Sequence, residues 1–262
     1  EGNKVIGLRA DMDALPIRET NTHDYVSNNT GVMHACGHDG HMAMLLGAAH
    51  KLSTNANFSG TIVFIFQPNE ELGLGAKAMI NEGLLENFPI QEIYGMHNLP
   101  GVPTGELLTR SGIICSSESL FEIKIKGMGG HSSMPQLGRD AITIGAEVVQ
   151  ALQTIISRRI ASGSGAVVSV TEFISNGQRN VLPGETILKG DVRTRRPDDR
   201  KKIELFLHQI TSGIASAHDI EIEVSFETEF IETINHIKPT ETVLKTAKKS
   251  GLKITDCKPM SF

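Results

Sequence analysis

The residues best suited to chemistry lie in one short run, His-Ala-Cys-Gly-His-Asp-Gly-His at positions 34–41. Cys36 and His38 are two residues apart, so in an extended segment their side chains point to the same side of the backbone. A thiolate and an imidazole together suit zinc, and manganese or cobalt would compete for the same ligands. A buried cysteine among solvated histidines is the alternative, but this density of ligating residues favours a metal site.

Two adjacent carboxylates, Glu70 and Glu71, follow an apolar run at residues 61–66. Adjacent glutamates on their own usually form a solvated turn. Beside a cysteine–histidine cluster they favour a hydrolytic site, because such sites need one carboxylate as a metal ligand and another, unliganded, to accept a proton from water. His97 follows a further short apolar run and is a third ligand candidate, although a lone histidine there would more often be a hydrogen-bonded loop residue.

Weaker candidates lie elsewhere along the chain. Asp11 and Asp13 follow the first apolar run and could orient ligating imidazoles by accepting hydrogen bonds, with a solvated loop as the alternative. His131 lies in a glycine-rich segment that could bring an imidazole over a site or only form a loop. Asn180 and Arg193 lie near predicted strand ends, and the Arg193 guanidinium suits bidentate binding of a carboxylate. A purely structural role is the alternative for both.

The elements that must position these residues alternate between strand and helix in the first hundred positions. Short apolar runs predict strands at residues 5–8, 61–66 and 93–96, and helical spacing predicts helices at 41–52 and 76–85. The run at 61–66 lacks alternation, which is typical of a strand buried on both faces. This order predicts a mainly parallel sheet, with the chemistry at the carboxyl ends of its strands.

A second pattern follows, in the order β-α-β-β-α-β, which is the ferredoxin-like signature. Its predicted elements are residues 120–126, 139–160, 166–174, 185–193, 197–217 and 220–226. A complete unit of this kind between α/β segments indicates an inserted domain. We therefore expect a first domain at 1–110, a second at 111–229, and the rest of the first at 230–262, with a helix at 240–250 and a strand at 252–255.

Composition excludes several classes of function. The 262 residues contain 25 Lys and Arg against 30 Asp and Glu, a net charge of -5 that gives no reason to expect a nucleic-acid partner. The longest apolar run is too short to cross a bilayer. Three scattered cysteines favour a reducing compartment over a disulfide framework, so we expect a cytoplasmic protein. The abrupt start suggests missing upstream sequence, which leaves export open as an alternative.

Seven motifs together resemble the metal-dependent N-acyl-amino-acid amidohydrolase family, which includes hippurate hydrolase, indole-acetyl-amino-acid hydrolase and N-acetyl-diaminopimelate deacetylase, within the aminoacylase and carboxypeptidase clan. They occur in family order along nearly the whole chain as RADMDALP, HACGHDGH, QPNEE, MHNLP, GMGGHSSMP, NVLPGE and GDVR. The resemblance implies a catalytic α/β domain with two metal ions and a ferredoxin-like lid domain that mediates dimers.

Position by position, the resemblance also implies roles for individual residues. Glu70 matches the general base, and His131 matches a lid histidine that approaches the neighbouring subunit's active site and stabilises the oxyanion. The wider clan has His-x-Asp where this chain has Asp11-Met12-Asp13, which weakens the case for Asp11 as a ligand. The metal ligands implied by the resemblance are Cys36, His38, Glu71 and His97.

The family carries a last metal-binding histidine near its C-terminus, which would lie beyond Phe262. His236 has no surroundings that suggest it as a substitute. The N-terminal helices of the catalytic domain are also missing. We therefore expect an internal fragment of a longer protein, with the catalytic domain truncated at both ends and the second metal under-coordinated.

These observations predict hydrolysis of the amide bond of small N-acyl amino acids, with two zinc or manganese ions, cobalt being a further option. Arg193 or Asn180 would hold the substrate carboxylate. One alternative is a thiol enzyme with Cys36 as the nucleophile. Others are a dipeptidase or carboxypeptidase of the same clan, and a non-catalytic fragment or homologue that binds ligand or dimerises. The acyl group and the amino acid stay open.

Overall fold

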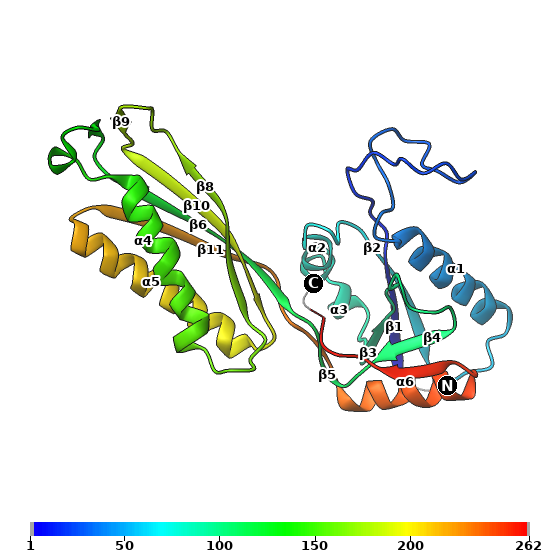
Figure 1. Ribbon diagram of the computed structural model, residues 1–262. Helices are drawn as coiled ribbons and strands as arrows, with labels where there is room; N and C mark the ends of the chain where they lie inside the picture. The colour runs from blue at the N-terminus through cyan, green and yellow to red at the C-terminus, as the bar shows by residue number, and fades with distance from the viewer. Residues whose placement is uncertain (1–2, 261–262) are drawn as a thin grey trace. The chain divides into compact units, whose positions relative to one another are not determined.

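The computed structural model describes residues 3–260. Two compact units make up the chain, with the division between Thr104 and Gly105, and each is described here by itself (Figure 1). Ser261 and Phe262, at the end where the sequence predicts a truncation, lie outside the described residues. Within residues 3–260, no helix combines the length and the apolar character that a membrane span needs.

The first unit is built on a parallel three-stranded sheet in the order β2-β1-β3. In Figure 1, α1 lies on one side of this sheet and α2 and α3 lie on the other. The elements are β1 Val5–Asp11, α1 His38–Thr54, β2 Thr61–Gln67, α2 Gly75–Asn81, α3 Leu84–Asn87 and β3 Glu92–Gly95. The parallel sheet and its helices confirm the α/β class expected from the alternating pattern.

Two local expectations differ from the structure. The single helix predicted at residues 76–85 is two helices, because Gly83 adopts a left-handed φ of 91° between α2 and α3. Strand β2 was expected to be buried on both faces, yet among its residues only Ile65 and Gln67 are buried. The reason is its position, since β2 lies at the edge of the three-stranded sheet that the structure describes.

The second unit contains a four-stranded antiparallel sheet in the order β11-β6-β10-β8. Helices α4 and α5 pack against it and against each other, and Ile123, Val148 and Leu207 are fully buried in their shared core. The element order is β-α-β-β-α-β, as the sequence pattern predicts. Its elements are β6 Ser117–Lys126, α4 Ala141–Thr154, β8 Val167–Ser175, β10 Glu185–Thr194, α5 Pro197–His218 and β11 Glu221–Phe230.

Shorter elements complete the second unit. Strand β13 pairs in parallel with β4, β12 pairs with β5, and β7 pairs with β9. These elements are β4 Glu106–Thr109, β5 Gly112–Cys115, β7 Gly130–His131, the 3-10 turn Pro135–Leu137, the π turn Ile155–Arg159, β9 Val181–Leu182, β12 Thr233–Asn235, α6 Ile237–Lys249 and β13 Lys253–Asp256. The division of the chain into domains at 1–110, 111–229 and 230–262 stays a prediction.

Candidate metal centre and active site

The carboxyl ends of β1, β2 and β3 meet at one edge of the parallel sheet, and the predicted site residues of the first unit gather there. The start of α1 brings Cys36 and His38 to the same edge. Gly37 makes this turn possible, because it adopts a left-handed φ of 82°. A Cβ atom at this glycine would lie 2.7 Å from side-chain atoms of Asn98, so the close approach also excludes a larger residue.

Four side chains predicted as metal ligands converge. Cys36, His38 and Glu71 each offer one ligand atom, and these three atoms lie within 4.8 Å of one another. His97 joins them, because its Nε2 atom is 3.4 Å from the Cys36 Sγ atom. The set therefore supplies one sulfur, two imidazole nitrogens and one carboxylate.

Backbone carbonyls determine which nitrogen each of these histidines offers. The His38 Nδ1 atom is 3.0 Å from the Asp13 carbonyl oxygen, and the His97 Nδ1 atom is 2.7 Å from the Asn98 carbonyl oxygen. A carbonyl oxygen only accepts, so each ring donates its proton from Nδ1. Both rings thus keep the Nε2 lone pair for the cluster, as in the second shell of protein metal sites.

Two buried atoms in the cluster support a metal ion. Both His38 Nε2 and Glu71 Oε1 are buried, have no hydrogen-bond partner among the described residues, and lie 3.8 Å apart. Buried polar atoms are nearly always paired, so two that face each other unpaired need another group between them. A divalent cation satisfies both lone pairs, and the sulfur, nitrogen and oxygen donors are those that zinc accepts. The residues therefore fit a metal ion.

Asp13 contacts two of the ligands. Its Oδ2 atom accepts a hydrogen bond of 3.0 Å from the Glu71 backbone N–H, and its Oδ1 atom is 3.4 Å from His38 Nδ1. Burial opposes its ionisation, but the N–H groups of Glu71 and Glu70 outweigh burial and lower the pKa of Asp13. These contacts are the ones an orienting residue would make.

Asp11 is fully buried, and both of its oxygens are occupied. Oδ2 accepts from Arg9 Nη1 at 2.7 Å, and Oδ1 accepts from His41 Nδ1 at 2.6 Å. Burial alone would raise its pKa, but the His41 hydrogen bond and the Arg9 charge lower it. Asp11 is thus a hydrogen-bond acceptor for both Arg9 and His41, and its Oδ2 atom lies 3.7 Å from His38 Nε2.

His41 is a site residue to which the sequence assigned no role. Its Nδ1 donates to Asp11, while its Nε2 accepts the Asn98 backbone N–H at 2.9 Å. Although His41 lies within ligand distance of His38 and His97, both of its ring nitrogens are used. It therefore connects the end of β1 to the segment after β3. Its spacing of three residues from His38 on one helix could have indicated a shared face.

Glu70 lies beside the cluster, with its Oε2 atom 3.9 Å from His38 Nε2. Burial raises the pKa of Glu70, the Arg9 charge opposes this, and the neighbouring Glu71 charge adds to it. Arg9 is itself held by a 2.9 Å hydrogen bond from its Nε to the Gln67 side chain. A carboxylate with a raised pKa next to a metal cluster suits proton transfer.

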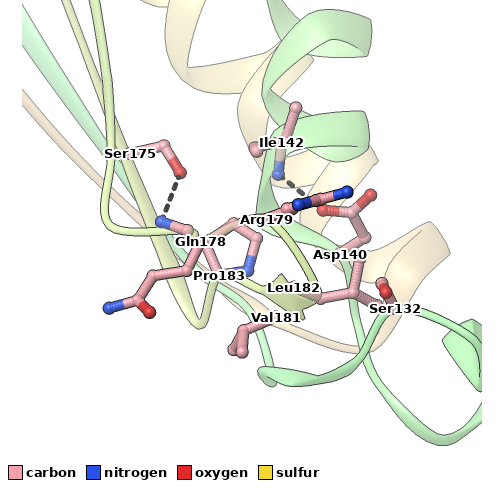
Figure 2. Close-up of a pocket in the computed structure, with 10 residues that line it drawn as sticks. Ser132, Asp140, Ile142, Ser175, Gln178, Arg179, Val181, Leu182 and Pro183 are labelled. Atoms are coloured by element: carbon pink, nitrogen blue, oxygen red, sulfur yellow. Dashed lines mark hydrogen bonds between the residues drawn. The ribbon is translucent and has the colours of Figure 1, made fainter.

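The second unit holds His131 and Asn180 near each other. His131 pairs with Val181 in the β7–β9 ladder, and the Asn180 carbonyl accepts the Ser132 N–H at 3.0 Å. An adjoining depression has a volume of about 430 Å³, and Figure 2 shows residues that line it. It is lined by Ser132, Asp140, Ile142, Ser175, Gly177, Gln178, Arg179, Val181, Leu182 and Pro183.

Arg193 lies on β10 in the four-stranded sheet, whereas β7 and β9 form a separate two-stranded pair. Its guanidinium pairs with Glu118 and, at 3.0 Å, with Asp191. Glu185, at the β9 end of β10, is separated from Arg193 by eight residue steps, or about 27 Å of strand. One copy of this unit therefore cannot bring Asn180 and Arg193 to the same small substrate.

Comparisons with known proteins show similarity along nearly the whole chain. The family model described as Peptidase family M20/M25/M40 matches residues 7–261. Hippurate hydrolase of Campylobacter jejuni is 38% identical over 247 residues, which cover 94% of this chain and 64% of that protein. N-acyl-L-amino acid amidohydrolase of Geobacillus stearothermophilus is 41% identical over 235 residues, covering 89% of this chain and 63% of that protein.

A solved structure is similar over the whole chain. The YXEP protein of Bacillus subtilis, described as a dinuclear metal binding peptidase from the M20 family, has a TM-score of 0.85 and 30% identity. The match covers 100% of this chain and 67% of that one. The chain spans less than two thirds of the length of the curated relatives above.

Proposed function

The chain belongs to peptidase family M20/M25/M40, and from this premise we propose that it is the metal-dependent hydrolase of a small N-acyl amino acid, releasing a carboxylate and a free amino acid. The observation that carries the proposal is the cluster of Cys36, His38, Glu71 and His97, in which the buried His38 Nε2 and Glu71 Oε1 atoms have no hydrogen-bond partner among the described residues. The names of the Campylobacter and Geobacillus relatives describe enzymes that cleave such substrates.

The cofactor we propose is a pair of divalent ions, zinc or manganese, with cobalt as a further option. Cys36, His38, Glu71 and His97 would hold them, and the Bacillus relative described as dinuclear supports the number. Divalent metal ions, when bound, lower the pKa of water and polarise a carbonyl group. The identity of the metal is to be determined by metal analysis of the purified protein.

The chain's own residues would then move the proton and hold the substrate. Glu70 accepts the proton of the attacking water and returns it to the leaving amine, a role that its raised pKa supports. His131 donates a hydrogen bond to the oxyanion. Asn180 binds the substrate carboxylate in preference to Arg193, because Glu118 and Asp191 already neutralise Arg193.

Residues 111–229 would form the lid and mediate a homodimer, in which the lid of one copy serves the active site of the other. The proposal rests on the resemblance of His131, in the GMGGHSSMP segment, to a lid histidine that approaches the neighbouring subunit's active site. We propose the cytoplasm as its location, on the small number of cysteines.

The test is hydrolysis of acetyl-, benzoyl- and indoleacetyl-amino acids by the full-length protein with added zinc or manganese. We expect a chelator to abolish turnover and the metal to restore it. Glu70→Gln should lower kcat by about 100- to 10,000-fold, the usual contribution of general acid–base catalysis, while metal content is retained. Chelator-insensitive turnover, or full activity of the Glu70 variant, would refute the proposal.

Two other functions can be weighed against this one. A thiol enzyme is disfavoured, because burial and then the charges of Glu71 and Glu70 raise the pKa of Cys36 to about 11, which keeps the thiol protonated near neutral pH. A carboxypeptidase has specific support in a relative of that name from Saccharolobus solfataricus, 37% identical over 246 residues. Including dipeptides and N-blocked peptides among the substrates tested distinguishes a carboxypeptidase from an N-acyl-amino-acid hydrolase.

A further inference from the structure

The His131 ring receives two hydrogen bonds from a single neighbour. The Ser133 backbone nitrogen is 3.2 Å from His131 Nδ1, and the Ser133 Oγ atom is 2.8 Å from the same nitrogen. A backbone N–H can only donate, so Nδ1 must present its lone pair to it. The hydroxyl, which can donate or accept, then also donates to Nδ1.

This arrangement determines where the His131 proton lies. A neutral imidazole carries one N–H, so a lone pair on Nδ1 places the proton on Nε2. His38 and His97 have the reverse arrangement, because their Nδ1 atoms donate to backbone carbonyls. The chain thus offers metal-binding lone pairs from the first unit and an N–H donor from His131.

The segment that carries Ser133 is held in place by backbone hydrogen bonds. The Met134 N–H donates to the His131 carbonyl at 2.9 Å, which closes a turn around Ser133. The Ser132 N–H donates to the Asn180 carbonyl at 3.0 Å, and His131 itself pairs with Val181. Because the turn is anchored on both sides, the Ser133 donors stay aimed at the imidazole ring.

We propose that Ser133 is a positioning residue that selects the Nε2–H tautomer of His131, so that this histidine acts as a hydrogen-bond donor to the oxyanion. The proposal rests on the role given to His131 in the proposed function. It adds the residue that sets the direction of the hydrogen bond, and it predicts that His131 neither binds metal nor accepts a proton from substrate.

The direct test is long-range ¹H–¹⁵N NMR of the full-length protein labelled at histidine, recorded without substrate at about pH 8, where ordinary imidazoles are mostly neutral. We expect the protonated nitrogen of His131 to be Nε2. Ser133→Ala keeps the backbone donor but loses the hydroxyl, so the ratio of Nε2–H to Nδ1–H should fall by about 2- to 10-fold, the equilibrium equivalent of one neutral hydrogen bond.

Kinetics of the same variants provide the second readout. Ser133→Ala should lower kcat in proportion to the fall in the fraction of His131 that carries its proton on Nε2 and leave KM unaltered, because the donor acts in the transition state. Ser133→Thr keeps the hydroxyl and should restore both readouts. Ser212→Ala, which removes an exposed hydroxyl on α5 away from the site, is the matched control and should match the unmodified protein.

A wild-type proton on Nδ1, or equal tautomer ratios in the Ser133→Ala and Ser212→Ala proteins, would overturn the proposal. A fall in the Nε2–H fraction without a matching fall in kcat would overturn its catalytic part. The proposed function can fail separately, since His131→Ala should lower kcat by about 100- to 1,000-fold. Full turnover by His131→Ala would refute the oxyanion role. The NMR spectrum recorded without substrate reports the tautomer of His131 independently of turnover, so the two failures can be told apart.

Discussion

Replacing His41 by glutamine tests whether His41 connects Asp11 to Asn98 or binds a metal ion. His41 is 2% exposed and joins Asp11 to Asn98 through its two ring nitrogens. Its ring also packs against that of His97, with centroids 4.6 Å apart. Glutamine can reach one of the two partners but not both, because its amide donor and acceptor lie on one terminal carbon. We therefore expect both the stability and the metal affinity to fall.

The size of both effects can be estimated from the hydrogen bonds that His41→Gln removes. A buried polar group without its hydrogen bond costs about 1–3 kcal/mol, so His41→Gln, which leaves one of two partners unpaired, should lower the free energy of unfolding by that amount. Residues that support metal ligands typically change metal affinity by about 10- to 100-fold when replaced. The same range is expected here, because Asn98 adjoins His97 and its carbonyl accepts the His97 Nδ1–H.

Urea unfolding of the metal-free protein measures the first effect, and zinc competition with a chromophoric chelator measures the second. His50→Gln is the matched control, because His50 lies on the same helix and is exposed. The reasoning is refuted if the His41 and His50 variants unfold alike and bind zinc alike. A loss of one whole equivalent of bound metal in His41→Gln would instead make His41 a ligand, which also contradicts the connector role.

Two further predictions concern the second unit. Burial opposes ionisation of Glu232, but a 2.6 Å hydrogen bond from Thr194 and the Arg200 charge lower its pKa below the ordinary 4.5. Ionised Glu232 therefore stabilises the fold above pH 4.5, and this contribution is lost as the pH falls through the lowered pKa. Urea unfolding from neutral pH downward should show that the difference in unfolding free energy between the unmodified protein and Glu232→Gln shrinks over this pH range. A difference that stays constant would contradict the prediction. A Cβ at Gly190 would lie 2.2 Å from the Ser169 carbonyl oxygen, so Gly190→Ala should cost about 1–3 kcal/mol of unfolding free energy. Gly213→Ala on α5, where a Cβ meets open space, should instead stabilise by up to about 1 kcal/mol, and equal effects at the two glycines would refute the clash.

Local sequence was sufficient for much of the fold and for the position of the site. Apolar runs and helical spacing predicted the alternating elements because they report side-chain burial, which repeats along a strand or helix. The helix expected at 76–85 is interrupted at Gly83, which adopts a left-handed φ. The spacing of apolar residues reports burial and does not report the backbone conformation of a glycine. Cys36, His38, Glu70 and Glu71 could be placed at one edge because parallel strands end on the same side of a sheet.

The sequence by itself determined which candidate ligating residues this protein has and where along the chain they lie. Only the tertiary structure decided what each side chain does, because hydrogen-bond partners come from distant segments whose register is set by packing. Asp11 meets His41 across 30 positions, and Arg193 meets Glu118 across 75, so neither pairing is visible in local spacing. Those partners make Asp11 an acceptor for His41 and Arg9, and they neutralise Arg193. Backbone carbonyls leave Nε2 of His38 and His97 facing the metal cluster.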